Sequence, residues 1–361
     1  MFMNTINGDH RSPDMEKDQK LTLEEQIEDL KSKNIQFANE SDYAKGLMTE
    51  TDAKRFLRYN TFYFHFKHYA HAFETYNNSS TTRYVNLTFG KMVELSKLDM
   101  YLRRIVLNMC LDVEHLLKTR LLYDITTNPE EDGKNIVDKY IGTFKNGYKD
   151  YVEIKEKHKN SILSKLVANF PDDQKELPAW KFVEALSFGQ FIKFYEFYYD
   201  EYSDRYKHGI PTFTMYLDNV RFLRNAAAHN SEILSHLNSK ATVEPTYNIK
   251  NIVLEEKQKA KLFKGIDAKK QLSNPVIHDF VTLLFLYRDL LKHSLNDGMY
   301  CRTMDELNAL FNPINGRMVL HRDLFSKDKG LVQSYRFIVD CLTYIGQHNS
   351  SRKKRQKWIL K

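Results

Sequence analysis

Apolar residues recur every three to four positions along most of the chain, which is typical of helices that bury one face. The segment 22–25, Thr-Leu-Glu-Glu, has the form of a capping box and predicts a short helix from Glu24 to Lys33. A second helical stretch is expected to begin near Thr51 and to continue through RFLRYNTFYFHFKHYAHAF. After a polar break at 77–82, we expect a long helix from about Thr88 to Tyr123. Its second half is apolar around most of its circumference, which predicts a central core helix.

The second half of the chain continues this helical pattern with one exception. Pro178 introduces the segment AWKFVEALSFGQFIKFYEFYYDEY, and a further helix is expected from about Pro211 to Leu237. Residues 240–255 have a strand-like character and suggest a small hairpin. Residues 256–361 read as helical and end in the basic segment SRKKRQKWILK.

This pattern predicts an all-α fold with at most a small β-hairpin. We divide the chain into a disordered N-terminus (1–19), an N-terminal helical lobe (20–82), a helical core (83–240) and a C-terminal helical region with a basic tail (241–361).

Composition narrows the class of protein. Hydrophobic residues make up 42% of the 361 residues, which indicates a folded chain. The net charge of +7 permits contacts with phosphate groups but does not require them, because a solvated basic surface gives the same value. Cys110, Cys301 and Cys341 lack the paired spacing of a zinc site or a disulfide framework. The N-terminus has no apolar signal core, and no apolar run is long enough to span a bilayer, so we expect a cytoplasmic protein without membrane contact.

An arginine followed after four to six residues by a histidine is the pattern with the most chemical content. It occurs three times, against roughly two occurrences expected by chance, so the pattern alone is not diagnostic. At about 100° per residue, Arg221, Arg224, Asn225, Ala228 and His229 fall on one arc of a helix. Two cations, an amide and an imidazole would then share one face beside a small alanine.

We assign Phe222, Leu223, Ala226 and Ala227 to the opposite, apolar side of this helix. The pair Arg288 and His293 is better explained by a helix C-terminus, where the helix dipole favours cations. Arg58 and His65 lie two turns apart, too far for a shared site.

Three histidines, His65, His68 and His71, follow one another in an aromatic-rich segment. They lack an accompanying carboxylate or cysteine at ligand spacing, so we expect no metal and no cofactor.

Glu114 lies on an apolar side of the long core helix, where an unpaired carboxylate would be costly. One explanation is a pair within the helix, with Lys118 or Arg103. The other is that Glu114 reaches across to orient Arg224 or His229.

The segment RNAAAHN at 224–230 resembles the signature of HEPN domains, in which an arginine, a polar residue, three spacers and a histidine lie on one helix. Three other blocks are similar to the AbiD/AbiF-like branch of the abortive-infection (Abi) family: KLTLEEQIEDLKSKNI, LRRIVLNMCLDVEHLLKTRL and LPAWKFVEALSFGQFIKFY. The order and spacing of the blocks match over roughly 20–237. The chain departs from the family after His229, where members often have an arginine and a Trp-Asn pair.

The resemblance implies a HEPN-type helical bundle and a metal-independent endoribonuclease that acts in antiphage defence or as a toxin. Attack by the ribose 2′-OH would give 2′,3′-cyclic phosphate ends. His229 would serve as general base or acid, Arg224 would hold the phosphate, and Asn225 would position either of them. Glu114, Lys118 and Arg221 would support these residues. The resemblance also implies a homodimer with two motif helices in one cleft.

Other interpretations remain open. The chain could be a non-catalytic module that binds RNA or a partner protein and is held inactive by a small noncoding RNA. It could also be a toxin silenced by nucleotide transfer from a separate enzyme, or a helical scaffold whose motif is a polar dimer seam. The basic tail would either contact RNA or be a solvated terminus, with these residues as its cations: Arg352, Lys353, Lys354, Arg355 and Lys357.

Overall fold

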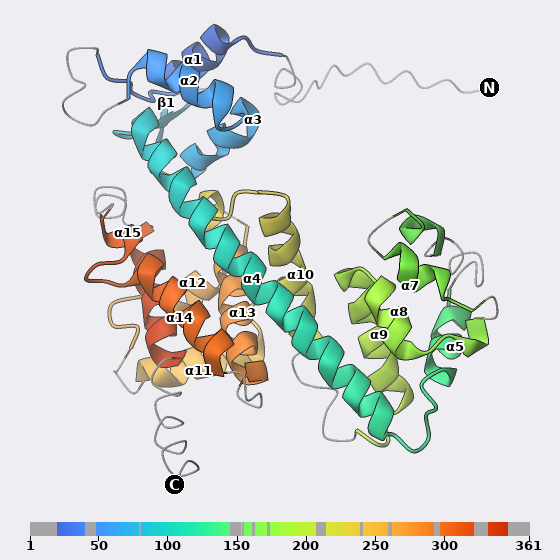
Figure 1. Cartoon of the computed structure of the whole chain (residues 1–361). Helices are drawn as coiled ribbons and strands as arrows, with labels where there is room; N and C mark the ends of the chain where they lie inside the picture. Colours follow the sequence, from blue (N-terminus) through green and yellow to red (C-terminus); the bar gives the residue numbers. More distant parts are fainter. Residues whose placement is uncertain are drawn as a thin grey trace, which may run out of the picture. The chain divides into compact units, whose positions relative to one another are not determined.

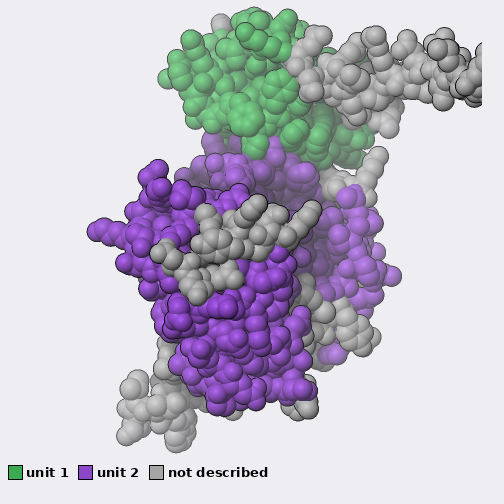
Figure 2. Space-filling view, turned by 90° about the vertical axis from the view of Figure 1, so that its right-hand side faces the viewer, with its two compact units in different colours: residues 1–95 green, residues 96–361 purple. Residues whose placement is uncertain are grey.

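The protein is described here from a computed structural model. The described residues are 20–39, 48–78, 81–144, 153, 155–160, 163–171, 174–206, 214–238, 241–258, 262–291, 297–320 and 331–345. The chain forms two compact units, residues 1–95 and 96–361, which Figure 2 colours separately.

The first unit begins with helices whose starts are fixed by local hydrogen bonds. Helix α1 (Leu23–Ser32) opens with the expected capping box between Thr22 and Glu25, and α2 (Glu50–Tyr59) opens with a second one. The helical stretch predicted to follow is interrupted after α2. It continues as the short α3 (Tyr63–Phe66) and a 3₁₀ helix (Lys67–Ala72).

A small antiparallel hairpin, β1 (Thr75–Asn78) and β2 (Thr81–Tyr84), follows these helices, with Thr75 opposite Tyr84. The sequence placed the hairpin at 240–255, and that prediction was wrong. Much of that segment forms α11 (Tyr247–Gln258), because Ile249 and Val253 are four residues apart and are buried together on one face.

The core of the first unit is aromatic. The Phe66 and Phe89 ring centroids lie 5.0 Å apart, and those of Phe56 and Phe66 lie 5.3 Å apart. Packing of this kind stabilises the unit through buried ring area and favourable ring geometry.

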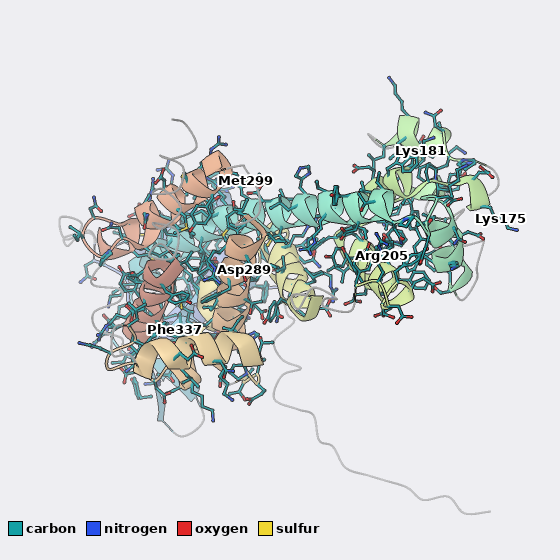
Figure 3. All side chains as sticks on the ribbon, turned by 90° about the horizontal axis from the view of Figure 1, so that it is seen from below. Lys175, Lys181, Arg205, Asp289, Met299 and Phe337 are labelled. Carbon is teal, nitrogen blue, oxygen red and sulfur yellow. The ribbon has the colours of Figure 1, made fainter. Side chains whose placement is uncertain are left out.

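Helix α4 (Phe89–Thr127) is the long helix that the sequence predicts, and most of it belongs to the second unit. Figures 1 and 3 show its teal ribbon running through that unit. One group of short helices gathers around its C-terminal end: α5 (Asn135–Gly142), α7 (Ser164–Ala168), α8 (Ala179–Ala185) and α9 (Phe188–Glu201). The labelled Arg205 lies here, and its Nη2 donates to the Thr127 carbonyl at 3.2 Å.

The remaining helices of the second unit form another group. They are α10 (Thr214–Ala228), α11, α12 (Ala268–Leu272), α13 (Pro275–Leu291), α14 (Asp297–Phe311), α15 (Arg317–Leu320) and a helix over 331–345. Helix α13 is buried over most of its surface and packs against α10. A hydrogen bond of 2.7 Å from Asn219 to Asp279 joins these two helices.

The described part of the chain is therefore all-α with one small hairpin, as the sequence predicts. Within the described residues, no helix combines the length and the apolar character that crossing a membrane requires.

Candidate functional site

The Arg224–His229 motif lies at the C-terminal end of α10, which stops at Ala228 and is shorter than the sequence predicts. The His229 amide still donates to the Asn225 carbonyl at 2.9 Å, so the imidazole keeps its helical position. Asn230 then adopts a left-handed conformation with a φ of 57°, and the Ser231 amide donates back to the Ala226 carbonyl at 2.8 Å. This pattern is a Schellman cap, in which asparagine is one of the few residues that accept the left-handed position. The cap ends the helix directly after the motif.

The residues that follow the cap are held by the buried carboxylate of Asp99 on α4. Its oxygens accept hydrogen bonds from the backbone amides of Ile233, at 3.2 Å, and Leu234, at 3.0 Å. Asp99 is fully buried and pairs with Arg103 one turn along α4. Helix α4 therefore fixes the chain on the far side of His229, and the sequence analysis did not identify Asp99. Its only sequence signal is an acid four residues before an arginine in an apolar helix.

The exposed face of α10 differs from the face that the sequence predicts. His229 is exposed, Asn225 is half-buried, and Leu223 and Ala227 are buried as expected. Phe222, which we assigned to the apolar side, is 55% exposed, so that assignment was wrong. At about 100° per residue, Phe222 lies only about 20° from His229. The phenyl ring therefore shares the imidazole's face, two turns earlier.

Arg224 is half-buried and turns toward its neighbour on the motif. Its Nη1 donates to Oδ1 of Asn225 at 3.3 Å, while its Nε is buried without a hydrogen-bond partner among the described residues. Its positive charge also acts on the buried thiol of Cys110 on α4, although burial dominates and raises the pKa of that thiol. The guanidinium thus lies between α10 and α4. The structure brings Arg224 and Asn225 together, with His229 on the next turn.

Arg221 lies one turn before Arg224 and is paired with Asp218, its Nη2 2.9 Å from the carboxylate oxygen. The same guanidinium lies 4.7 Å from the centroid of the Phe222 ring. Its stem crosses Gly189 on α9, where an added Cβ would lie 3.1 Å from the Arg221 Cδ. Gly189 therefore leaves the space in which the Arg221 side chain is packed.

Glu114 and Lys118 form the intrahelical pair that was one of the two explanations for Glu114. Their charged atoms are 3.1 Å apart, and each side chain is 16% exposed. Lys118 also lies 5.9 Å from the centroid of the Phe191 ring. Glu114 raises the pKa of the Cys110 thiol, whereas Arg224 lowers it, so both charges lie near this thiol and the Glu114–Lys118 pair lies near the inner side of the motif helix.

The basic tail, from Arg352 to Lys357, lies outside the described residues. Within the described part of the chain, no group of three or more histidine, cysteine or acidic side chains could hold a metal ion.

Comparison with known proteins assigns this region to a family. Residues 55–235 match the family model of Abi-like proteins, a span that begins in α2 and ends just after the Asp99-bound segment. No curated protein and no solved structure matches the chain.

Proposed function

The chain belongs to the family of Abi-like proteins, and from this membership we propose that it is a cytoplasmic endoribonuclease of the HEPN type that acts in abortive infection or as a toxin. The observation that supports the proposal most directly is the arrangement at the end of α10. An exposed imidazole follows, about one turn later, a guanidinium and an amide that contact each other.

The chemistry that suits these groups is cleavage of RNA by its own 2′-OH. The 2′ oxygen attacks the adjacent phosphorus, its proton passes to a base, and the bond to the 5′ oxygen breaks as that oxygen is protonated. The products are a 2′,3′-cyclic phosphate and a 5′-OH. Histidine can accept and donate a proton near neutrality, so His229 would be the base or the acid. The planar guanidinium of Arg224 would bind non-bridging phosphate oxygens, with Asn225 holding its orientation.

Efficient cleavage by this route benefits from both a base and an acid, and one copy of the motif supplies one histidine. We therefore propose a homodimer in which the exposed faces of two α10 helices form one cleft. Asp218, Phe222, Asn225 and His229 recur along that face at spacings of three to four residues, and Ala228 beside them is small and exposed. Small residues allow close approach, and an exposed aromatic ring is typical of an interface centre.

A non-catalytic RNA-binding module, in complex with a small noncoding RNA, is the second candidate. It is favoured by the inward position of Arg224, whose Nε is buried. In that case RNA would bind at the site and remain intact.

Incubation of the purified protein with total RNA in the presence of a chelator separates these candidates. We expect fragments with cyclic phosphate and 5′-OH ends, because the proposed groups need no metal. His229→Ala should lower the cleavage rate at least about hundredfold, as loss of a general acid or base does. The matched control is His236→Ala, since His236 is also exposed and lies outside the motif. Intact RNA with the unmodified protein, or equal cleavage by His229→Ala, would refute the nuclease.

A further inference from the structure

A second surface with nucleic-acid-binding chemistry lies in the first unit, around α2 and α3. Its rings are among the most exposed large aromatic groups of the described chain. Tyr59 is 72% exposed, Phe62 is 67% exposed and Phe64 is 37% exposed. Exposing so much ring area to water is unfavourable unless something covers it, and such patches mark interaction sites.

Cationic groups accompany these rings. Arg55, Arg58 and Tyr59 are spaced by three and four residues, and all three are exposed on one side of α2. The Arg58 guanidinium lies 5.6 Å from the centroid of the Tyr59 ring. Among the described residues, no acidic side chain forms an ion pair with Arg55 or Arg58. The charge of both guanidinium groups is therefore available to an anionic ligand.

The rings also lie close enough to act together. Tyr59 and Phe62 are three residues apart, so their Cα atoms are within about 11 Å of each other. The Phe62 ring lies 5.0 Å from that of His65, and the Lys67 ammonium lies 4.8 Å from the centroid of the Phe64 ring. The segment 55–67 thus presents flat rings next to positive charges on one short stretch of chain.

We propose that this aromatic-basic patch, residues 55–67, binds single-stranded RNA, with bases stacked on Tyr59 and Phe62 and phosphates bound by Arg55 and Arg58. Aromatic platforms beside cations are how proteins bind single strands without sequence readout. Two positive charges that have no acidic partner in the described part of the chain favour an anionic strand over a neutral partner protein. The inference rests on the proposed function, because RNA is the ligand there. It adds a binding surface outside the motif helix.

The test measures binding in a protein that cannot consume its ligand. His229→Ala protein is titrated against a fluorescently labelled single-stranded RNA of mixed sequence, and binding is followed by fluorescence anisotropy. Tyr59→Ala and Phe62→Ala should each weaken binding about tenfold, the usual cost of losing one stacked base. Phe62→Tyr should retain the affinity, because a tyrosine ring stacks equally well.

Two further measurements identify the contacts. Replacing Arg55 and Arg58 together by glutamine should reduce the slope of log affinity against log salt by about 1.4, since each phosphate contact of a single strand contributes about 0.7. Duplex RNA of the same sequence should bind more weakly, because its bases are not free to stack. The matched control is Tyr123→Ala, which removes a ring that is 66% exposed on α4, and this variant should bind RNA normally.

The proposal that this patch binds RNA is refuted if the Tyr59 and Phe62 variants bind single-stranded RNA as tightly as their parent, or if the parent binds none. Self-association that the two variants abolish while RNA affinity stays unchanged would identify a second copy as the occupant and would also refute it. Failure of the nuclease is seen separately, as intact RNA in the cleavage assay. RNA that is bound through the patch but never cleaved would leave the present inference standing.

Discussion

The segments RYNTFYFHFK (58–67) and KFYEFYYDEY (193–202) have nearly the same density of aromatic residues, but they differ in what their rings contact. In the first, Tyr59, Phe62 and Phe64 are exposed beside cations. In the second, most of the rings are buried within the second unit. The same composition thus leaves three rings exposed in the first segment, beside the buried Tyr63 and Phe66, and forms mostly core in the second.

The difference follows from the partners that each segment finds. Helix α9 carries the second segment along α4, where the Asp124 carboxylate accepts a hydrogen bond from the Tyr199 hydroxyl. The Tyr198 and Tyr206 hydroxyls lie 2.9 Å apart, and the Tyr202 hydroxyl donates to Glu131. Buried tyrosines are stable when each hydroxyl has such a partner. The first segment is broken after α2 and offers no continuous helical face to bury.

Alkaline pH should have the largest effect on the buried tyrosines, because their ionisation should unfold the second unit. Burial, the neighbouring Tyr195 and the hydrogen bond to Asp124 raise the pKa of Tyr199, and burial raises that of Tyr140 to about 12. An unfolded tyrosine has a pKa of about 10. A group whose folded pKa is raised contributes stability that is complete below its unfolded pKa and is lost as pH rises through the folded value. Unfolding is therefore expected between about pH 10 and pH 12.

Tyrosinate absorbance and circular dichroism, followed together in one titration, measure this effect. The ionisation of the buried tyrosines and the loss of helix should coincide. Complete ionisation with the helical signal intact would contradict the buried cluster.

Tyr199→Ala should have the next largest effect on stability, because it removes a buried ring and leaves a cavity. Replacing a buried aromatic residue by alanine costs about 3–5 kcal/mol of unfolding free energy. Tyr199→Phe keeps the ring and removes only the donor to Asp124, so it should cost about 1–2 kcal/mol. Urea unfolding measures both values, and equal losses for the two variants would show that the ring is not tightly packed.

Tyr59→Ala should have the smallest effect on stability, within about 0.5 kcal/mol, because an exposed side chain outside buried networks contributes little. The same urea experiment gives the value. A loss above about 1 kcal/mol would mean that Tyr59 supports the fold of the first unit and would weaken the contrast between the two segments.

Local sequence signals predicted much of this fold. The capping box at Thr22 gave the start of α1, and apolar periodicity gave the long helix α4. The hairpin was misplaced because the β-branched residues near Ile249 were read as a strand, although the four-residue spacing to Val253 favours a helix. For short apolar segments these two patterns overlap, and packing decides between them.

The candidate site was only partly predictable for a different reason. The order of Arg224, Asn225 and His229 on one helix follows from sequence spacing, whereas the contact of Asp99 with Ile233 and Leu234 joins residues 134 and 135 positions apart. No local pattern reveals such a contact. The exposure of Phe222 was within reach, since its helical angle places it beside His229.

The anchored end of α10 has one more consequence. Helix termini ordinarily fray, and a side chain on a fraying turn loses conformational freedom when it meets its ligand. Here the Schellman cap and the Asp99 carboxylate restrain the backbone on both sides of Asn230. The ordering of the turn that carries His229 is thus completed during folding, and a molecule that reaches the imidazole finds it preorganised.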